Sequence, residues 1–525
     1  MIEYFTFFLV LIVLIVLLIM LADRIKVAYP VLLVIAGLLI SLIPGMPTVH
    51  IEPELIFIIF LPPLLYEAAF VISWKELWRW RRIVGSFAFV VVFLTAMSVA
   101  FVTNSIIPGF SLALGFLLGG IVSPPDAVSA NAILKFVKLP KRMSSVLEGE
   151  SLLNDASSLI IFRFAMIAVG TGQFVWQQAT LSFSWMIIGG VAIGLLVGWL
   201  MMKAHKILPT DANIDIVLTL VAPYVMYIAA EEVHSSGVLA VVSGGLLMSA
   251  KRNDFLSSTS RLQGYNVWKS LIFLLNGLVF LLIGLDLPEI SEGLEQEGIG
   301  FSVAVGYGLM VTAVLILGRF LASFGAVIVT KIVGNFIPVA DKNPGLKAPL
   351  ILGWSGMRGV VSLAAALSIP IEMSNGAPFP FRNLILFITF VVILTTLVLQ
   401  GLTLPWLIKK VNIPDFGDHY KEEEAEELLK MGLAEHTLQY FQTNYSQQLD
   451  SNKHLQPIAT LLEHRNNRQQ ETEMSAEAKK VYLKILEEQR VWLMNENRTD
   501  EKLDEEIVRK HLYAIDLEEE KLKYT

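Results

Sequence analysis

The sequence predicts an all-α polytopic membrane protein with about 13 transmembrane helices and a helical cytoplasmic C-terminal region. Of its 525 residues, 54% are hydrophobic and 17% charged, an apolar excess that a soluble core of this size cannot hide. Charge is also uneven. Residues 1–410 contain 25 basic and 22 acidic residues, whereas 411–525 contain 15 and 25. We therefore expect a transmembrane domain over 1–410 and an acidic helical domain over 411–525.

Thirteen segments are apolar enough to be interpreted as membrane spans. They cover approximately residues 4–21, 29–43, 53–71, 83–105, 111–137, 145–168, 181–204, 213–230, 235–250, 268–287, 300–331, 349–369 and 381–407. No basic region precedes the first segment, so we expect a retained helix with its N-terminus outside. Alternate threading then places 21 basic residues of the membrane region inside and Arg382 outside. This bias predicts a multi-pass plasma (inner) membrane protein with a cytoplasmic C-terminus.

The C-terminal region changes to a polar, helical periodicity from Asn412 onward. Leu483, Leu486 and Leu493 are spaced to form the apolar face of an amphipathic helix. A solvated acidic tail with little fixed structure is the alternative. Exposed aromatics do not alternate with a basic stripe, so nucleic acid is not an expected partner. The chain has no cysteine, which excludes disulfides and thiol chemistry.

Two predicted spans are interrupted by residues that a plain membrane anchor would avoid. Glycines and prolines break the fifth span at residues 119–126, and glycines break the twelfth at 353–359. Non-helical backbone at membrane depth is tolerated only where protein or a watery cavity satisfies it. The two spans run in opposite directions, each between two neighbours, so we expect inverted repeats with two broken, crossing helices. Such pairs indicate the midplane site of a transporter.

The first break, Ser123-Pro124-Pro125-Asp126, resembles the start of a new half-helix. Ser123 fits the N-cap position, Pro124 the first helical position, and Asp126 the third helical position, which completes an S-x-x-D capping box. Asp126 would also face the positive end of the half-helix dipole. Whether Asp126 only caps the helix or also binds a cation stays open at this point.

The sixth span has the densest group of polar residues, from Glu148 to Ser158. Ser151 and Asp155 are four residues apart on one helical face, and Glu150 and Asn154 share the adjacent face. Ionisable groups in a membrane are costly, so each needs a partner or a cation. Hard cations prefer oxygen ligands. Asp155 is thus the candidate that binds either a metal ion or a proton, with Asn154 as its neutral companion.

Four further charges lie within predicted spans. Glu67 is either an ion-path residue or a partner that links helices. Arg319 and Arg358 are buried-charge candidates, and Glu150 with Arg358 would form a structural ion pair. Arg163, near the outer end of its span, is expected to extend toward the interface.

These motifs together resemble the monovalent cation:proton antiporter superfamily, in its electroneutral sodium/proton exchanger branch of bacterial type. The matching pieces are Phe60-Leu61-Pro62-Pro63 with Glu67, Gly149-Glu150-Ser151-Leu152-Leu153-Asn154-Asp155, and Gly356-Met357-Arg358-Gly359. Their order over about 400 residues makes the resemblance specific. It implies thirteen helices divided into a dimerisation domain and a mobile core, a homodimer, and a role in pH and sodium homeostasis.

The resemblance also implies residue roles. Asp155 would exchange cytoplasmic sodium, or lithium, for an external proton. Ser151 and the Ser123 backbone would help to coordinate the metal ion, with Glu67 nearby. Asn154, and Glu150 with Arg358, would hold the core together. Arg319 would offset the negative ends of the half-helices. An Asn before Asp155, where electrogenic relatives have a second Asp, implies an electroneutral 1:1 exchange. We expect no resident cofactor.

One departure and several alternatives bear on this interpretation. The branch commonly has Thr-Asp-Pro at the first break, whereas this chain has its carboxylate at Asp126, two places later. The role of Asp126 and the cation preference are therefore open. A potassium/proton antiporter is the first alternative and a gated cation channel the second, although no repeated carbonyl filter is present. We do not expect an enzyme, because no spacing pairs His234, Ser235 or Ser236 as nucleophile and base.

Overall fold

The protein consists of two compact units, Met1–Pro414 and Asp415–Thr525. A computed structural model describes residues 2–43, 53–72, 74–126, 129–130, 132, 137, 139–171, 176–333, 335, 345–373, 376–413, 422–449, 456, 460, 476–499 and 505–523. The described elements are helical, apart from an isolated β-bridge between Glu372 and Pro378. The division falls close to the predicted change from membrane to soluble composition.

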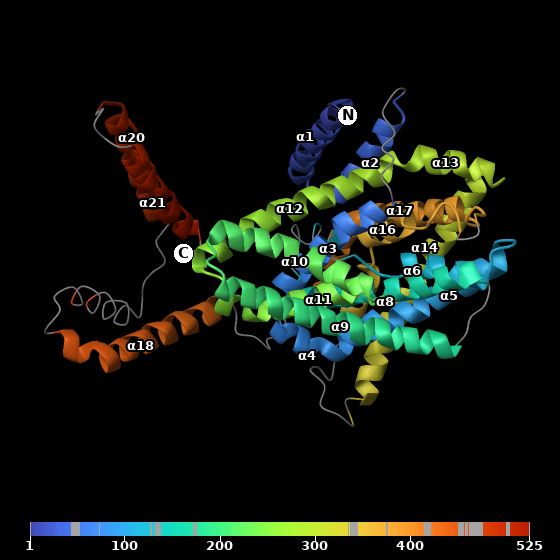
Figure 1. Ribbon diagram of the computed structural model, residues 1–525, viewed down its shortest axis with the longest axis horizontal. Helices are drawn as coiled ribbons and strands as arrows, with labels where there is room; N and C mark the ends of the chain where they lie inside the picture. Colours follow the sequence, from blue (N-terminus) through green and yellow to red (C-terminus); the bar gives the residue numbers. More distant parts are fainter. Residues whose placement is uncertain are drawn as a thin grey trace. The chain divides into compact units, whose positions relative to one another are not determined.

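Most helices of the first unit overlap the predicted spans, whereas α4 and α13 lie almost entirely between them (Figure 1). The first half contains α1 (Ile2–Ile25), α2 (Tyr29–Ser41), α3 (Pro53–Val71), α4 (Trp74–Gly85), the π-helix η1 (Ser86–Val91), α5 (Val92–Ile106), α6 (Leu112–Val122) and α8 (Lys141–Thr171). The second half contains α9 (Trp176–Ile207), α10 (Ala212–Glu232), α11 (Gly237–Phe255), α12 (Ser258–Leu285), α13 (Leu287–Gln296), α14 (Phe301–Val333), α15 (Lys347–Trp354), α16 (Val360–Leu367) and α17 (Arg382–Val411).

Eight helices in the described ranges are long and apolar enough to cross a membrane, and Tyr29–Ser41, Ile58–Val71 and Leu112–Val122 are shorter apolar helices. The all-helical polytopic fold is therefore confirmed, whereas the count of thirteen spans and the inverted repeats stay predictions. Sequence periodicity missed α13, a short amphipathic helix between two spans.

Both predicted breaks are present, although each is shorter than expected. Residues 355–359 separate α15 from α16, and α6 continues through residues 119–122 and ends at Val122, within the predicted first break. The predicted capping box is wrong, however. Ser123 is the C-cap of α6. Asp126 caps the next helical turn instead, because its Oδ2 accepts a hydrogen bond from the Ser129 amide, at 3.3 Å. Each proline disfavours the α-helical conformation of the residue before it, so the new helical turn starts later than the capping box predicts.

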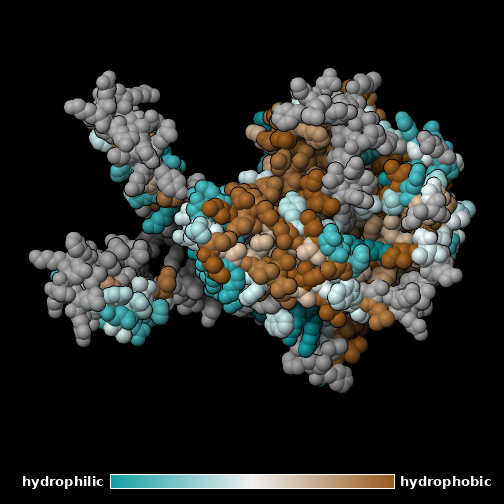
Figure 2. Space-filling view, viewed as in Figure 1, coloured by the Kyte–Doolittle hydropathy of each residue, from teal (hydrophilic) through white to brown (hydrophobic). Residues whose placement is uncertain are grey.

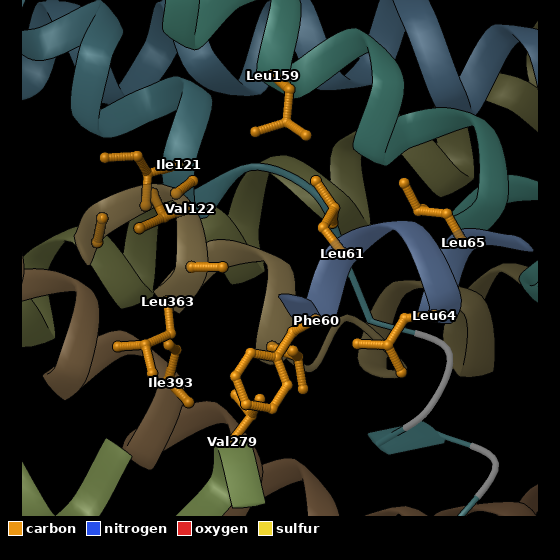
Figure 3. Packing of buried hydrophobic residues seen from close by; sticks show 14 of the residues in the cluster. Phe60, Leu61, Leu64, Leu65, Ile121, Val122, Leu159, Val279, Leu363 and Ile393 are labelled. Carbon is orange, nitrogen blue, oxygen red and sulfur yellow. The ribbon is translucent and has the colours of Figure 1, made fainter. Parts of the chain in front are cut away.

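A continuous apolar core joins the broken helices to their neighbours. Figure 3 shows Phe60 and Leu61 of α3 near Val122 of α6, Leu363 of α16 and Ile393 of α17, all buried. Elements far apart in sequence thus share one packed interior, which holds the two breaks in place.

The second unit contains α18 (Glu422–Leu449), α20 (Ala476–Thr499) and α21 (Glu505–Lys523). Leu486 is buried, whereas Trp492 is exposed. Arg490 of α20 forms ion pairs with Asp516 and Glu519 of α21, at 2.9 and 2.8 Å. Figure 2 shows broad hydrophobic areas on the first unit and mostly hydrophilic described residues on the second. This unit contains regular helices, in agreement with the helical expectation for the tail.

Candidate functional site

The two breaks touch each other directly. The Asp126 amide donates a hydrogen bond of 2.7 Å to the carbonyl of Met357, so the segment after α6 meets the one between α15 and α16 at a point that we call the crossing. Gly359, the N-cap of α16, permits this approach, because a Cβ there would overlap Asp126 Oδ2. The Asp126 carboxylate therefore lies at the start of α16 as well as at the start of the helical turn that contains Ser129.

The α8 helix brings Asn154 and Asp155 to this crossing. Asn154 is completely buried, and its Nδ2 donates a 3.2 Å hydrogen bond to the carbonyl of Pro125, within the first break. Asp155 is 8% exposed and lies within electrostatic range of Asp126. One amide side chain thus links α8 to the break and holds the neighbouring carboxylate beside it.

Two side-chain oxygen atoms near the crossing have no hydrogen-bond partner among the described residues. Asn154 Oδ1 and Ser123 Oγ are buried there without a hydrogen-bond partner. Buried polar atoms of this kind need an explanation, such as a bound ion or water. Ser151, one turn before Asp155, is half-buried. The arrangement offers carboxylate, amide and hydroxyl oxygens to a hard cation.

Glu67 is half-buried in α3. It lies within electrostatic range of Glu148, which is on α8, two turns before Asp155. The structure thus places Glu67 against the same helix as the candidate site. Its role as ion-path residue or helix-linking partner stays a prediction.

The predicted pair of Glu150 with Arg358 is wrong, because Arg319 of α14 takes that position. Its Nη1 and Nη2 lie 2.5 and 3.0 Å from the two carboxylate oxygens of Glu150, a bidentate pair with both side chains buried. Arg319 Nε also donates to the carbonyl of Leu352 in the last turn of α15, at 3.0 Å. Gly356 leaves room for the arginine, because a Cβ there would overlap Arg319 Cδ.

Arg358 occupies a different position in the second break. Its amide donates to Thr396 Oγ1 of α17, at 3.2 Å. Its guanidinium is buried, with Nε and Nη1 unpartnered among the described residues. Arg319 and Glu150 both lie within electrostatic range of it. The second break therefore contains a positive charge close to an ion pair rather than within it.

Two contacts were not predicted from the sequence. The single hydroxyl hydrogen of Ser157 on α8 has two carbonyl acceptors within reach, Ala88 O in η1 and Asn154 O at 2.9 Å. A π-helical turn has no simple sequence signal, although such turns often occur at functional sites. Arg163 pairs with Glu231 of α10 at 2.5 Å, and its expected extension toward the interface stays a prediction. An acidic partner in a distant segment could not be assigned from local spacing.

Interrupted helices that meet beside a buried carboxylate are typical of one class of membrane proteins, the secondary transporters. The chain belongs to the family described as the transmembrane sodium/hydrogen exchangers, whose profile matches residues 10–410. This family is part of the monovalent cation:proton antiporter superfamily, which the sequence motifs resembled. It is a family of transporters and not of enzymes.

Two curated relatives are named sodium, potassium, lithium and rubidium/H(+) antiporters. The one from Bacillus pumilus is 35% identical over 392 residues, which cover 73% of this chain and 58% of the relative. The one from Bacillus subtilis is 36% identical over 388 residues, covering 72% and 57%. The chain thus spans less than two thirds of the length of these relatives.

The fold is similar to that of a sodium proton antiporter from Methanocaldococcus jannaschii. The TM-score is 0.61 at 19% identity, with 78% of this chain and 99% of that chain covered. This likeness supports the arrangement of the helices.

Proposed function

We propose that the chain exchanges cytoplasmic Na⁺ or Li⁺ for external H⁺, 1:1 and without net charge transfer, through a single site at Asp155. The observation that carries the proposal is the position of Asp155, buried next to Asn154 where the two broken helices cross. Asp126, Ser123 and Ser151 complete the proposed set of oxygen ligands.

Competition at one carboxylate supplies the coupling. A protonated Asp155 has no charge with which to bind the cation, and a cation-bound Asp155 has no free charge for the proton. An empty, ionised carboxylate is costly to move through lipid. Alternating access then carries either cargo across and suppresses the unloaded step.

A cavity beside α8 supports access from the predicted outer face. It has a volume of about 470 Å³ and is lined by residues that include Leu159, Ile160 and Ser236. Leu159 is one helical turn beyond Asp155. The Arg163–Glu231 pair also lines this cavity, and provides charged groups along the approach.

The direct test is cation-induced dequenching of a pH-sensitive dye in proteoliposomes that contain only this protein. Wild type should give a saturable signal with Na⁺ and Li⁺, and Asp155→Asn should reduce it to that of empty liposomes. Asp215→Asn, in a buried acid outside the site, is the matched control that should retain exchange. Retained exchange in Asp155→Asn would remove Asp155 from its role.

Stoichiometry requires a separate measurement. A 1:1 exchange should produce no current on a solid-supported membrane and should proceed equally at imposed potentials of either sign. A current that follows the potential would exclude electroneutral exchange while leaving the shared site intact.

A potassium/proton antiporter is the second candidate, because the names of both Bacillus relatives include potassium. Oxygen ligands alone do not set cation size. Parallel titrations with Na⁺, Li⁺ and K⁺ in the same proteoliposomes decide between the candidates. A gated channel would instead conduct the cation without moving protons.

We also propose a homodimer in the plasma (inner) membrane, with the N-terminus outside and the second unit cytoplasmic. Family membership supports the membrane location, and the distribution of basic residues supports the orientation. Cross-linking in intact membranes tests the dimer. Accessibility of single cysteines, introduced into this cysteine-free chain, tests the orientation.

A further inference from the structure

A groove on the first unit lies between α4, η1 and α5 on one side and α14 on the other. Its volume is about 900 Å³, within the range of ligand sites in proteins. The groove wall is mostly apolar, and it includes exposed side chains such as Val90, Leu94 and Leu321. None of the ligands of the proposed cation site lines it.

One end of the groove is strongly basic. Arg79, Arg81 and Arg82 line it together, on the amphipathic helix α4. The Arg81 guanidinium lies 4.8 Å from the centre of the Trp78 ring and donates to the Trp78 carbonyl. Arginine beside tryptophan is typical of a helix end at the headgroup level of a bilayer. The sequence predicts that this end faces the cytoplasm.

The groove extends from Arg79 to Ser98 along its α4–η1–α5 wall, and over a distance comparable to one leaflet along α14. Its α14 wall extends from Gly318 to Thr330, which corresponds to about 18 Å of helix. Half of a hydrocarbon core is about 15 Å thick. An apolar groove of this length with guanidinium groups at its headgroup end complements an acyl chain joined to an anionic head.

We propose that this groove binds an anionic phospholipid from the cytoplasmic leaflet, with its phosphate at Arg79, Arg81 and Arg82. Basic pockets between helices on this side of a membrane are known lipid sites. Guanidinium groups bind phosphate oxygens in bidentate geometry. A zwitterionic lipid would have the same chains, but its amine would reduce the attraction to the arginine cluster.

Both walls of the groove adjoin contacts that hold α8, the helix that contains Asp155. Gly318 precedes Arg319, which forms the ion pair with Glu150. Phe87 precedes Ala88, whose carbonyl accepts the hydrogen bond from Ser157 on α8. A lipid in the groove therefore packs against the elements that hold α8, and its binding should stabilise the folded protein.

Two glycines of α14 provide a substitution and its matched control. A Cβ added at Gly325, which lines the groove, or at Gly306, which does not, would meet no atom within 4 Å. Gly325→Leu should fill the groove and Gly306→Leu should not, and both replace glycine by a better helix former.

A second pair of variants tests the headgroup end. Arg81→Gln with Arg82→Gln removes two charges of the arginine cluster. The matched control is Lys251→Gln with Arg252→Gln, which removes two charges from the exposed end of α11, outside the groove.

The experiment is native mass spectrometry and thermal unfolding of the delipidated full-length protein, titrated with phosphatidylglycerol or with phosphatidylcholine of identical chains. We expect tighter binding of phosphatidylglycerol, accompanied by a higher unfolding temperature. Gly325→Leu and the double arginine variant should each weaken this binding about tenfold, which corresponds to about 1.4 kcal/mol, and both controls should retain it.

Equal binding of the two lipids, or full binding by Gly325→Leu, would overturn the proposal. Equally tight binding of free glycerol phosphate would do the same, because the site would then recognise the anion alone. None of these readouts requires transport.

Discussion

Asp155 and Asp215 are both buried carboxylates of the first unit, but their surroundings differ. Asp215, in the first turn of α10, is 4% exposed, and its two oxygens form hydrogen bonds with His205 Nδ1 and Ser260 Oγ, each at 2.7 Å. Asp155 is 8% exposed, and no donor among the described residues bonds to its carboxylate. Side chains of two other helices bind the carboxylate of Asp215, whereas the carboxylate oxygens of Asp155 can accept another ligand.

The difference separates a structural acid from a functional one. A buried carboxylate with good partners stabilises one arrangement of helices, and its removal leaves the partners unsatisfied. A buried carboxylate without donors is costly and is retained in a membrane only where a cation or proton compensates it. Burial alone does not distinguish the two, but hydrogen-bond partners do.

The largest effect on stability should come from the most completely paired acid. Glu150→Gln leaves the buried Arg319 guanidinium without its counter-charge, which typically costs about 3–5 kcal/mol. Thermal unfolding of the purified protein in detergent measures this cost. Glu231→Gln is the control, because its pair with Arg163 is about one-third exposed and should contribute about 1 kcal/mol or less. Equal losses would show that the Glu150 pair is not tightly buried.

A smaller effect tests the comparison between the two aspartates. Asp215→Asn weakens two charge-assisted hydrogen bonds, and should lower the free energy of unfolding by roughly 1.5–3 kcal/mol. Asp155→Asn should leave it unchanged or raise it, because it removes a buried charge that has no donor among the described residues. Thermal unfolding without added Na⁺ or Li⁺ measures both. A greater loss of stability in Asp155→Asn would contradict the distinction between a structural and a functional acid.

Much of the fold could be predicted because lipid imposes simple local rules. Apolar length locates the helices, and the glycines and prolines at residues 119–126 and 353–359 locate the two breaks. Asp155 stands out because it lies in the densest polar group of an apolar segment, next to Asn154 and one turn after Ser151. These features are local in the sequence, so one sequence is enough to locate them.

The partners of the charges could not be predicted in the same way. Glu150 had two arginine candidates, Arg319 and Arg358, and only packing brings Arg319 to it across 169 positions. The cap at Asp126 depends on the residue at which the chain returns to a helical conformation after the two prolines. The tertiary structure determines these partners, so they cannot be inferred from local sequence spacing.

Glu297 provides an intermediate case and the smallest expected effect. It follows α13, outside the predicted spans, and accepts hydrogen bonds from the amides of Asn383 and Leu384 in α17, at 3.0 and 3.3 Å. Burial nevertheless raises the pKa of its carboxyl above the ordinary value, and these hydrogen bonds oppose the rise. The carboxyl is therefore partly satisfied, between the conditions of Asp155 and Asp215.

The raised pKa of Glu297 sets the sign of a pH dependence. The folded protein holds the proton more tightly than the unfolded chain. The stabilisation that this group contributes is therefore fully present below the ordinary pKa, and it is lost as pH rises through the pKa of the folded state. Glu297→Gln keeps an acceptor but cannot ionise. Its unfolding temperature relative to wild type should therefore increase between about pH 4 and pH 7, by no more than about 2 °C because solvent screens the exposed part of the side chain.

Glu292→Gln, on the exposed side of α13, controls for the loss of one negative charge, and its unfolding temperature should follow that of wild type across the same pH range. A relative decrease for Glu297→Gln with rising pH would mean that the α17 amides outweigh burial. Glu297 would then belong with Asp215 as a satisfied acid, and hydrogen-bond donors from the backbone alone would be enough to make a buried carboxylate structural.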